Sequence, residues 1–193
     1  MNGRDCMKEY WKGGNMLYPL PAVMVSCGRK NEKPNIITVA WTGTVCTNPP
    51  MLYISVRPER HSYNIIKDTK EFVVNLVTKD LTYACDYCGV KSGANVDKFK
   101  EMKLTPLESK YVSCPSIEES PLSLECRVKE IIKLGSHDMF IANILGVTVD
   151  KKYMDSTGKF NLNDSNLITY SHGQYFTFGE WQGKFGYSVK KKK

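Results

Sequence analysis

Short stretches rich in Val, Ile, Thr and aromatic residues recur through the first half of the chain, separated by clusters of Gly, Asn and Pro. Each stretch is about seven residues long, which is typical of a β-strand. Two longer stretches of the same kind follow, joined by a Gly-Ser-His-Asp turn. The pattern predicts strands at residues 21–27, 36–42, 51–57, 71–77, 122–134 and 139–150. Strands at this spacing favour an antiparallel barrel or sandwich over a sheet of alternating strands and helices.

Helical signals are fewer than strand signals. Ser62 and Asp80 are candidate N-caps of two short helices, and a third helix is expected over residues 96–102. The polar, glycine-containing segment at residues 153–166 is expected to form a long loop. Because no internal repeat or linker interrupts the pattern, we expect a single, mainly β domain over residues 1–193.

The composition is that of a globular protein, with 41% hydrophobic and 24% charged residues. No stretch reaches the roughly 20 apolar residues that span a bilayer, and the polar first 15 residues do not resemble a signal peptide. The seven cysteines indicate free thiols in a reducing compartment, and Cys27, Cys46 and Cys126 lie in apolar runs where we expect them to be buried. We therefore expect a cytoplasmic protein without membrane association.

The net charge of +7 is unevenly distributed along the chain. Four of the positive charges lie at residues 190–193, an expected flexible tail, and the other lysines are interspersed with acidic residues. No nucleic-acid-binding motif accompanies them. We expect no nucleic-acid partner, with binding of a polyanion through the tail as the alternative. The surplus of positive charge suits a small anionic ligand equally well.

Several chemistries are disfavoured by the motifs that the sequence lacks. It contains no G-x-G-x-x-G, no P-loop, no G-x-S-x-G elbow and no H-x-x-x-H pair, so neither a Rossmann site nor a metal site is indicated. Cys85 and Cys88 form a C-x-x-C pair, which has two interpretations: a redox dithiol, or two small buried residues on a helix. The structural interpretation is favoured, because no second pair and no thioredoxin-like pattern accompany it.

Arg57, Arg60, His61 and Ser62 come together where a predicted strand ends and a predicted helix begins. Free backbone N–H groups and the helix dipole favour an anion at such a point, and arginine donates bidentate hydrogen bonds to phosphate. The cluster therefore indicates a phosphate site. Solvated charges at a strand end are the alternative.

Segments that follow one another along the chain resemble a known family. They read N-x-x-T-V-A-W-T-G at residues 35–43, P-P-x-x-x-x-S-V-R-x-x-R-H-S-Y-x-x-I at residues 49–66, E-F-V-V-N-L at residues 71–76 and V-D-K-F at residues 96–99. This series resembles the flavin reductase-like (flavoredoxin) family, whose members are homodimeric split β-barrels that bind FMN. The resemblance covers nearly the whole chain. It implies a Greek-key antiparallel barrel with a few short helices and with FMN as cofactor.

The resemblance also implies which residues contact the cofactor. Those implied to lie along the flavin and its ribityl chain are Asn35, Thr38, Ala40, Trp41 and Thr42. The implied phosphate-side contacts are Ser55, Val56, Arg57, His61 and Ser62. The strand end implied to present main-chain groups to the ring comprises Asn75, Leu76 and Val77. Lys98 resembles a family lysine that reaches the flavin or its phosphate, and Tyr170 is implied to pack near the ring. The alternatives are a core or interface aromatic for Trp41 and a solvated helix lysine for Lys98.

The implied activity is redox chemistry, because FMN accepts a hydride or single electrons without a protein nucleophile or metal. Two functions stay open: an NAD(P)H-dependent flavin or ferric reductase, and a flavoredoxin-type carrier that receives electrons from a redox protein. The family's G-D-H motif, linked to reactions with pyridine nucleotides, is present only as Ser136-His137-Asp138. This change puts NAD(P)H use in question. His137 remains a candidate for the open face of the flavin.

Overall fold

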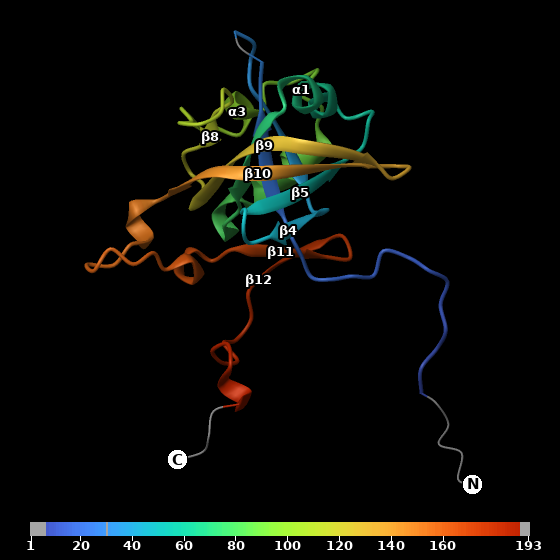
Figure 1. The fold of residues 1–193 in the computed structure, drawn as a ribbon, viewed down its shortest axis with the longest axis vertical. Helices are drawn as coiled ribbons and strands as arrows, with labels where there is room; N and C mark the ends of the chain where they lie inside the picture. The colour runs from blue at the N-terminus through green and yellow to red at the C-terminus, as the bar shows by residue number, and fades with distance from the viewer. Residues whose placement is uncertain (1–6, 30, 190–193) are drawn as a thin grey trace.

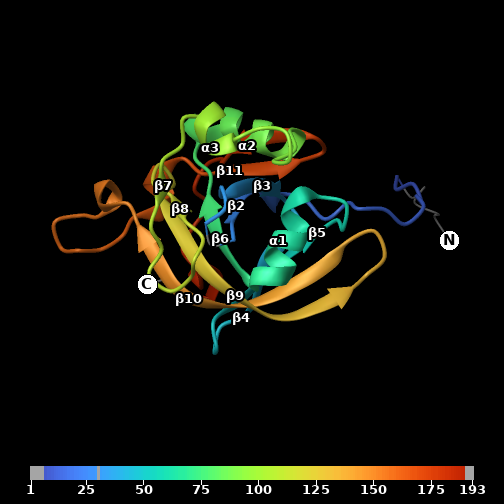
Figure 2. The same ribbon diagram turned by 90° about the horizontal axis from the view of Figure 1, so that it is seen from above.

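The computed structural model describes residues 7–29 and 31–189. Its main feature is a seven-stranded antiparallel sheet with the strand order β3-β2-β6-β9-β10-β5-β4. The sheet curls around α1 (His61–Thr69) into a half-barrel (Figure 1, Figure 2). Its strands are β2 (Val23–Cys27), β3 (Asn35–Val39), β4 (Thr42–Cys46), β5 (Met51–Val56), β6 (Glu71–Leu76), β9 (Leu122–Lys133) and β10 (Asp138–Val149). The mainly β, antiparallel prediction is confirmed, and the predicted tail at residues 190–193 lies outside the described residues.

The strand predicted over residues 36–42 is wrong at its end, because the chain divides there into two edge strands. β3 ends before Ala40, and β4 begins at Thr42 on the opposite edge of the sheet. The Thr42 N–H donates to the Ala40 carbonyl at 3.0 Å, which makes the connection tight. Ala40 and Trp41 therefore bridge the gap between the two edges, and this gap is the split of the half-barrel.

Two smaller sheets flank the main one. β1 (Leu20–Pro21), β11 (Ile168–Ser171) and β12 (Gln174–Thr177) form a three-stranded sheet, which lies below β4 in Figure 1. β7 (Pro106–Leu107) pairs with β8 (Ser116–Ile117). Each of these strands has four residues or fewer, which is too short to show an alternating pattern. The sequence therefore predicted none of them as a separate element. Only β1 overlaps a predicted strand, the first one.

The helices form close to their predicted places but with different caps. Besides α1, the structure has α2 (Thr82–Val90) and α3 (Lys98–Glu101). Ser62 does not cap α1: it lies inside the first turn, and no side chain caps this helix. Asp80 lies in a preceding 3-10 turn, η1 (Lys79–Leu81), rather than at the start of α2. Only α3 among these three α-helices has a side-chain cap, because Asp97 accepts a hydrogen bond from the Lys100 N–H at 3.1 Å.

The expected loop at residues 153–166 is largely irregular, as its polar composition indicated. It follows the 3-10 turn η2 (Lys151–Tyr153) and contains one further short turn, η3 (Leu162–Ser165). The segment therefore connects β10 to the small sheet without a long element of its own.

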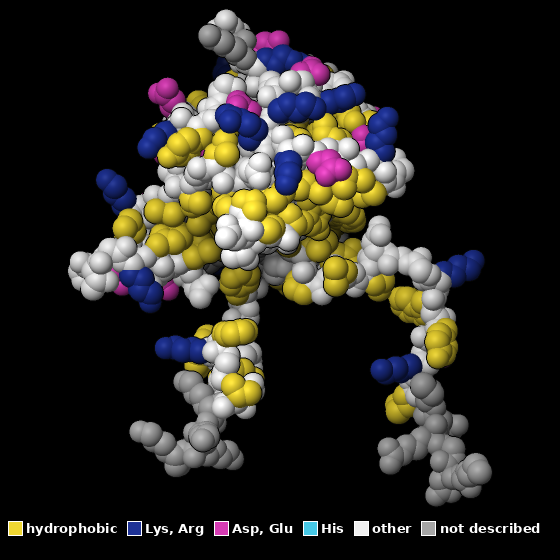
Figure 3. All heavy atoms as spheres, in the orientation of Figure 1, with side chains coloured by type: hydrophobic (Ala, Val, Ile, Leu, Met, Phe, Trp, Pro, Cys, Tyr) yellow, Lys and Arg dark blue, Asp and Glu magenta, His cyan; other side chains and the backbone are white. Residues whose placement is uncertain are grey.

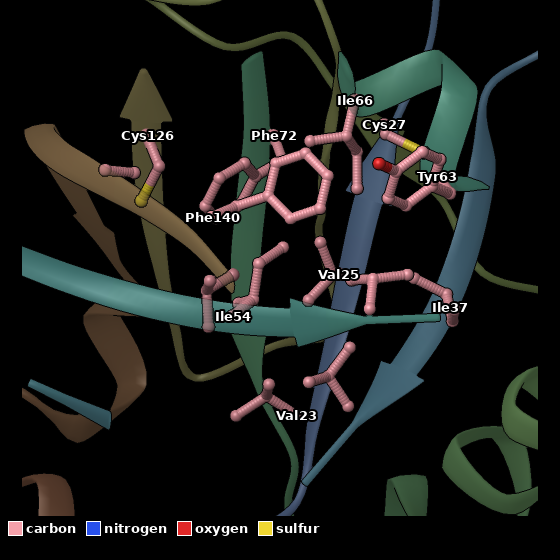
Figure 4. Packing of buried hydrophobic residues seen from close by; sticks show 14 of the residues in the cluster. Val23, Val25, Cys27, Ile37, Ile54, Tyr63, Ile66, Phe72, Cys126 and Phe140 are labelled. Atoms are coloured by element: carbon pink, nitrogen blue, oxygen red, sulfur yellow. The ribbon is translucent and has the colours of Figure 1, made fainter. Parts of the chain in front are cut away.

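The core has two layers, one on each face of the curled sheet. Inside the curl, Tyr63 and Ile66 of α1 pack with Phe72, Phe140 and other sheet residues (Figure 4). Outside it, α2 and α3 cover β2 and β3 (Figure 2). β2 is buried along its whole length because both of its faces are covered. This explains why its sequence is an uninterrupted run rather than an alternating one.

Two extended arms leave the body on the side of the small sheet (Figure 1, Figure 3). They comprise residues 7–19 and residues 178–189, the second ending in the 3-10 turn η4 (Tyr187–Val189). Large apolar side chains on both arms are exposed, including Trp11 at 79% and Trp181 at 76%. Such clustered apolar exposure is typical of surfaces that contact another molecule. Within the described ranges, no helix has the length and apolar character needed to cross a membrane.

Candidate functional site

A groove lies along the split of the half-barrel, where Ala40 and Trp41 connect the two edge strands. It consists of two adjoining cavities that share Ile37 and Arg60. One cavity, the aromatic end, brings together the predicted residues Thr38, Ala40, Trp41, Ser55, Val56, Arg57, His137 and Tyr170. The other, the basic end, brings together the predicted residues Asn35, His61, Ser62 and Lys98. Most of the predicted site therefore converges on one continuous groove.

The most unusual group at the basic end is the amine of Lys98. Its side chain is only 3% exposed, which excludes the solvated-lysine interpretation. The Nζ donates to the carbonyls of Ile36 and Cys88 at 2.6 and 2.7 Å, and among the described residues it has no carboxylate partner. Burial lowers the pKa of this amine. A buried cation is costly unless it is paired, so the site is completed best by an external anion.

The N-terminus of α1 points more positive charge at the same end of the groove. The helix starts at His61 without a side-chain cap, so its first N–H groups and its dipole are available to a ligand. Arg60 lines both cavities and, unlike Arg57, which pairs with Glu59 at 3.3 Å, has no ion-pair partner in the described ranges. Arg60 is therefore the freer of the two arginines for an anion.

β3, the start of α1 and the loop after α2 are in contact beneath the α1 N-terminus. The Asn35 Nδ2 donates to the Ser62 hydroxyl at 2.7 Å, and both side chains are buried. Gly93 allows this contact, because a Cβ at that position would lie 2.0 Å from the Asn35 Oδ1. Asn35 and Ser62 thus shape the basic end through each other, and the loop after α2 must carry a glycine there.

Flat side chains line the aromatic end. The rings of Trp41 and His137 are parallel to within 1° with centroids 6.1 Å apart, and Tyr170 and Tyr175 meet edge-on at 5.7 Å. The Ser55 N–H donates to the Trp41 carbonyl at 2.8 Å and so fixes the backbone that carries the indole. Planar walls of this kind suit a flat heterocycle.

His137 lies where the aromatic end meets the charged turn. Burial lowers its pKa, as do the charges of Arg57 and Arg60, while Glu59 acts in the opposite direction. The Nδ1 is 2.9 Å from the Ser136 hydroxyl, which leaves Nε2 as the ring nitrogen available to a ligand. Burial and the two arginines therefore favour the neutral imidazole, whose Nε2 can form a hydrogen bond with a molecule in the groove.

Four predicted site residues do not reach the groove. Thr42 is buried and its hydroxyl donates to the Tyr53 carbonyl at 2.6 Å. Asn75 is fully buried and holds the barrel together, because its amide donates to the Met24 carbonyl at 3.0 Å. Leu76 and Val77 line a separate cavity beside the small sheet. A polar residue between apolar ones at a strand end looks the same in sequence whether it binds a ligand or ties strands together.

Other groove residues were absent from the predicted set. Gly89, Ser92 and Gly93 line the basic end, and Tyr175 lines the aromatic end. The Ser-Gly pair is visible in the sequence as a turn, whereas nothing in the sequence relates Tyr175 to β3.

The C-x-x-C pair contributes backbone carbonyls, rather than thiols, to the hydrogen bonds that hold Thr38 and Lys98. Thr38 donates a hydrogen bond to the Cys85 carbonyl, and Lys98 donates to the Cys88 carbonyl at 2.7 Å. Both thiols are buried, and burial raises the pKa of Cys85 to about 12 and that of Cys88 to about 11. Since the thiolate is the reactive form, burial disfavours reaction of either thiol, which agrees with the structural interpretation of the pair.

A curled antiparallel half-barrel with a groove at its split, aromatic at one end and basic at the other, has the architecture of the split-barrel flavin proteins. Residues 15–179 match the family model of the flavin reductase like domain. The chain belongs to the flavin reductase-like family. A protein of Archaeoglobus fulgidus, itself uncharacterized, is 35% identical over 161 residues, covering 83% of this chain and 89% of that protein.

Solved structures agree with this assignment. The flavoredoxin of Desulfovibrio vulgaris (Miyazaki F) superimposes with a TM-score of 0.88 at 28% identity, over 95% of this chain and 100% of that one. The flavoredoxin of Methanosarcina acetivorans gives a TM-score of 0.84 at 26% identity with the same coverage. The split-barrel fold and the flavin reductase-like family are therefore confirmed.

Proposed function

We propose that this protein binds FMN in the groove and acts as an oxidoreductase through it, with the phosphate at the basic end and the flavin ring at the aromatic end. The observation that carries the proposal is Lys98, a buried amine that pairs with no carboxylate of residues 7–29 and 31–189 and lines the groove with the uncapped N-terminus of α1. This arrangement fits a phosphate monoester, and the adjoining aromatic cavity fits a flat ring.

In this arrangement the chain supplies binding and orientation. Lys98 and Arg60 neutralise the phosphate, and the α1 N–H groups add hydrogen bonds to its oxygens. Trp41 covers part of the aromatic end, and His137 offers Nε2 there as a hydrogen-bonding group. When bound, FMN supplies the acceptance and release of a hydride or of single electrons.

Two candidate functions differ in the source of the electrons that reduce the flavin. An NAD(P)H-dependent flavin or ferric reductase is the first candidate, supported by the position of His137 in the groove beside Arg57 and Arg60. A flavoredoxin-type electron carrier is the second, supported by Ser136 in place of an acidic residue and by the two flavoredoxins among the similar structures. Stopped-flow mixing of the FMN-loaded protein with NADH or NADPH separates them. Bleaching of the flavin at catalytic rates supports the reductase, and slow bleaching with fast reduction by a ferredoxin supports the carrier.

We also propose that the protein is a homodimer. The support is the exposed apolar surface of the two arms, whose aromatic side chains each offer roughly 150–250 Å² for burial. Two copies of such arms supply the area of a stable dimer interface, which is about 2,000 Å² or more. Sedimentation of the full chain tests this directly, and a monomer at micromolar concentration would overturn it.

The free thiols support a cytoplasmic location. Cys27 and Cys126 are buried as expected, whereas Cys46 is only half-buried because β4 is an edge strand. None of the six cysteines within the described ranges forms a disulfide. This fits a reducing compartment.

The test of the FMN proposal compares two lysines of the same helix. Lys98→Met removes the buried amine, whereas Lys100→Met removes an exposed amine two residues away. We expect Lys98→Met to weaken FMN about tenfold to a hundredfold, the value of a charge-assisted hydrogen bond, and to leave riboflavin unchanged. Lys100→Met should change neither. Calorimetry with both ligands measures this, and equal losses of FMN and riboflavin would show that the phosphate is elsewhere.

A further inference from the structure

The turn at residues 57–62 joins β5 to α1 and carries the arginines of the groove. Its two ends are anchored to the same residue. Val56, the last residue of β5, pairs with Asp138 of β10 in the strand register. Tyr63, in the first turn of α1, donates a hydrogen bond from its hydroxyl to the Asp138 Oδ2. Asp138 therefore closes the base of the turn.

This hydrogen bond is formed inside the protein. Tyr63 is 6% and Asp138 is 5% exposed, and the Tyr63 ring also packs edge-on against Phe140 of β10 with centroids 5.4 Å apart. Both rings lie in the core enclosed by the sheet (Figure 4). The pair is therefore a specific contact, made in the core, between the first turn of α1 and the first residue of β10.

The same residue also lies next to His137. His137 ends the turn that precedes β10, so the anchoring of Asp138, the first residue of β10, fixes the backbone beside the imidazole. Asp138 is buried, whereas His137 lines the aromatic end with Arg57. One buried hydrogen bond thus ties together the turn at the basic end and the imidazole at the aromatic end.

We propose that Tyr63 and Asp138 are positioning residues that hold the 57–62 turn and His137 in the geometry that binds the phosphate-bearing ligand. Neither Tyr63 nor Asp138 is among the residues that line the groove, so both act on the ligand through the lining residues that they position. The ligand part of this inference rests on the proposed function. The ordering of the turn does not, because it is a property of the free protein.

The decisive variant is Tyr63→Phe, with Asp138→Asn and Tyr111→Phe as partners. Tyr63→Phe removes only the hydroxyl, while Asp138→Asn keeps an oxygen that accepts its hydrogen bond. Tyr111→Phe removes an exposed hydroxyl outside the groove and serves as the control. We expect faster hydrogen exchange of the 57–63 backbone in ligand-free Tyr63→Phe, and wild-type exchange in the other two variants.

Calorimetry then gives the ligand readout. FMN should bind Tyr63→Phe about tenfold more weakly, the value of one hydrogen bond to a charged group, while riboflavin binding stays within about twofold of wild type. Asp138→Asn, which keeps the hydrogen bond, should retain the wild-type preference for FMN. The loss of FMN without loss of riboflavin in Tyr63→Phe is the result that a merely stabilising role would not predict.

Two results would overturn the inference: unchanged exchange at residues 57–63 in folded Tyr63→Phe, or equal losses of FMN and riboflavin. If the wild-type protein binds no flavin, the proposed function fails and the exchange measurement still decides whether the turn is held by this pair. If Tyr63→Phe does not fold, the double variant Tyr63→Phe with Asp138→Leu removes the unpaired charge as well, and fast exchange at the turn is expected in it.

Discussion

Two irregular segments lie on the half-barrel and are held in opposite ways. The segment at residues 109–115 is held by carboxylates of the sheet. The buried Glu125 accepts hydrogen bonds from two of its amides at 3.1 and 2.6 Å, and Glu71 accepts two more from one serine, both at 2.8 Å. The turn at residues 57–62 is held at its base by Asp138 and at Ser62 by the Asn35 amide, and Arg60 within it has no acidic partner among the described residues.

The two segments differ in whether the protein itself supplies the negative charge that each one binds. In the 109–115 segment, the negative charge that satisfies the backbone is part of the protein, so the segment is complete without a ligand. At the groove, no carboxylate among the described residues pairs with Lys98 or Arg60, because Glu59, which lines the basic end, pairs with Arg57. Substitutions in the first segment should therefore change stability, and those in the second should change ligand affinity.

The largest effect is expected when Glu125 is removed. Glu125→Ala removes the acceptor of two part-buried hydrogen bonds, which the N–H groups of Lys110 and Tyr111 donate. We expect the free energy of unfolding to fall by about 2–4 kcal/mol, since a hydrogen bond to a charged group contributes about 1.5–3 kcal/mol and water replaces part of what is lost. FMN affinity of the folded fraction should not change. Denaturant titration and calorimetry measure both, with the exposed Glu108→Ala as control. A loss of FMN affinity would show that the two segments are not independent.

The fold was largely predictable because most of its strands bury a continuous apolar surface. β2, β5, β6, β9 and β10 each form within a residue or two of the predicted range. The break at Ala40 was not predictable, since the apolar run continues through it and only the closure of the sheet places its two halves on opposite edges. Local pattern carries no information on which edge a strand joins.

The site was predictable where its residues are consecutive and unpredictable where packing decides. Arg60, His61 and Ser62 reach the groove because a strand end and a helix start are adjacent in sequence. Asn75 does not reach the groove, because its side-chain amide donates a hydrogen bond to the neighbouring strand β2. The burial of Lys98 depends on α3 packing over β3, which is a contact between segments more than sixty residues apart and leaves no local pattern.

A steric substitution sharpens the comparison at the groove. The Cβ of Gly93→Ala would lie 2.0 Å from the Asn35 Oδ1, so Asn35 must leave the Ser62 hydroxyl. We expect about 1–3 kcal/mol of destabilisation, as for overpacking, and a loss of FMN affinity because the basic end is displaced. Gly179→Ala is the control, since no atom lies near its Cβ. Thermal unfolding and calorimetry measure the two effects. An unchanged FMN affinity would mean that Asn35 does not shape the ligand site.

The smallest effect tests the built-in anions through pH. Burial raises the pKa of the Glu71 carboxyl, but the hydrogen bonds from Ser113 and Arg127 outweigh it, and the net pKa lies below its ordinary value of 4.5. A carboxyl with a lowered folded pKa stabilises the protein above its unfolded pKa, and this stability is lost as the pH falls from about 4.5 through the folded value.

Glu71→Gln should therefore flatten the decline of unfolding free energy below pH 4.5. The change is expected to be about 1 kcal/mol, because solvent reaches the Arg127 side of the pair and screens it. Ser113→Ala, which removes one donor and keeps the carboxylate, should lie between wild type and Glu71→Gln. Denaturant titrations at several pH values measure the slopes. If Glu71→Gln and wild type decline in parallel, the 109–115 segment is held by shape rather than by charge, and the contrast with the groove loses its electrostatic basis.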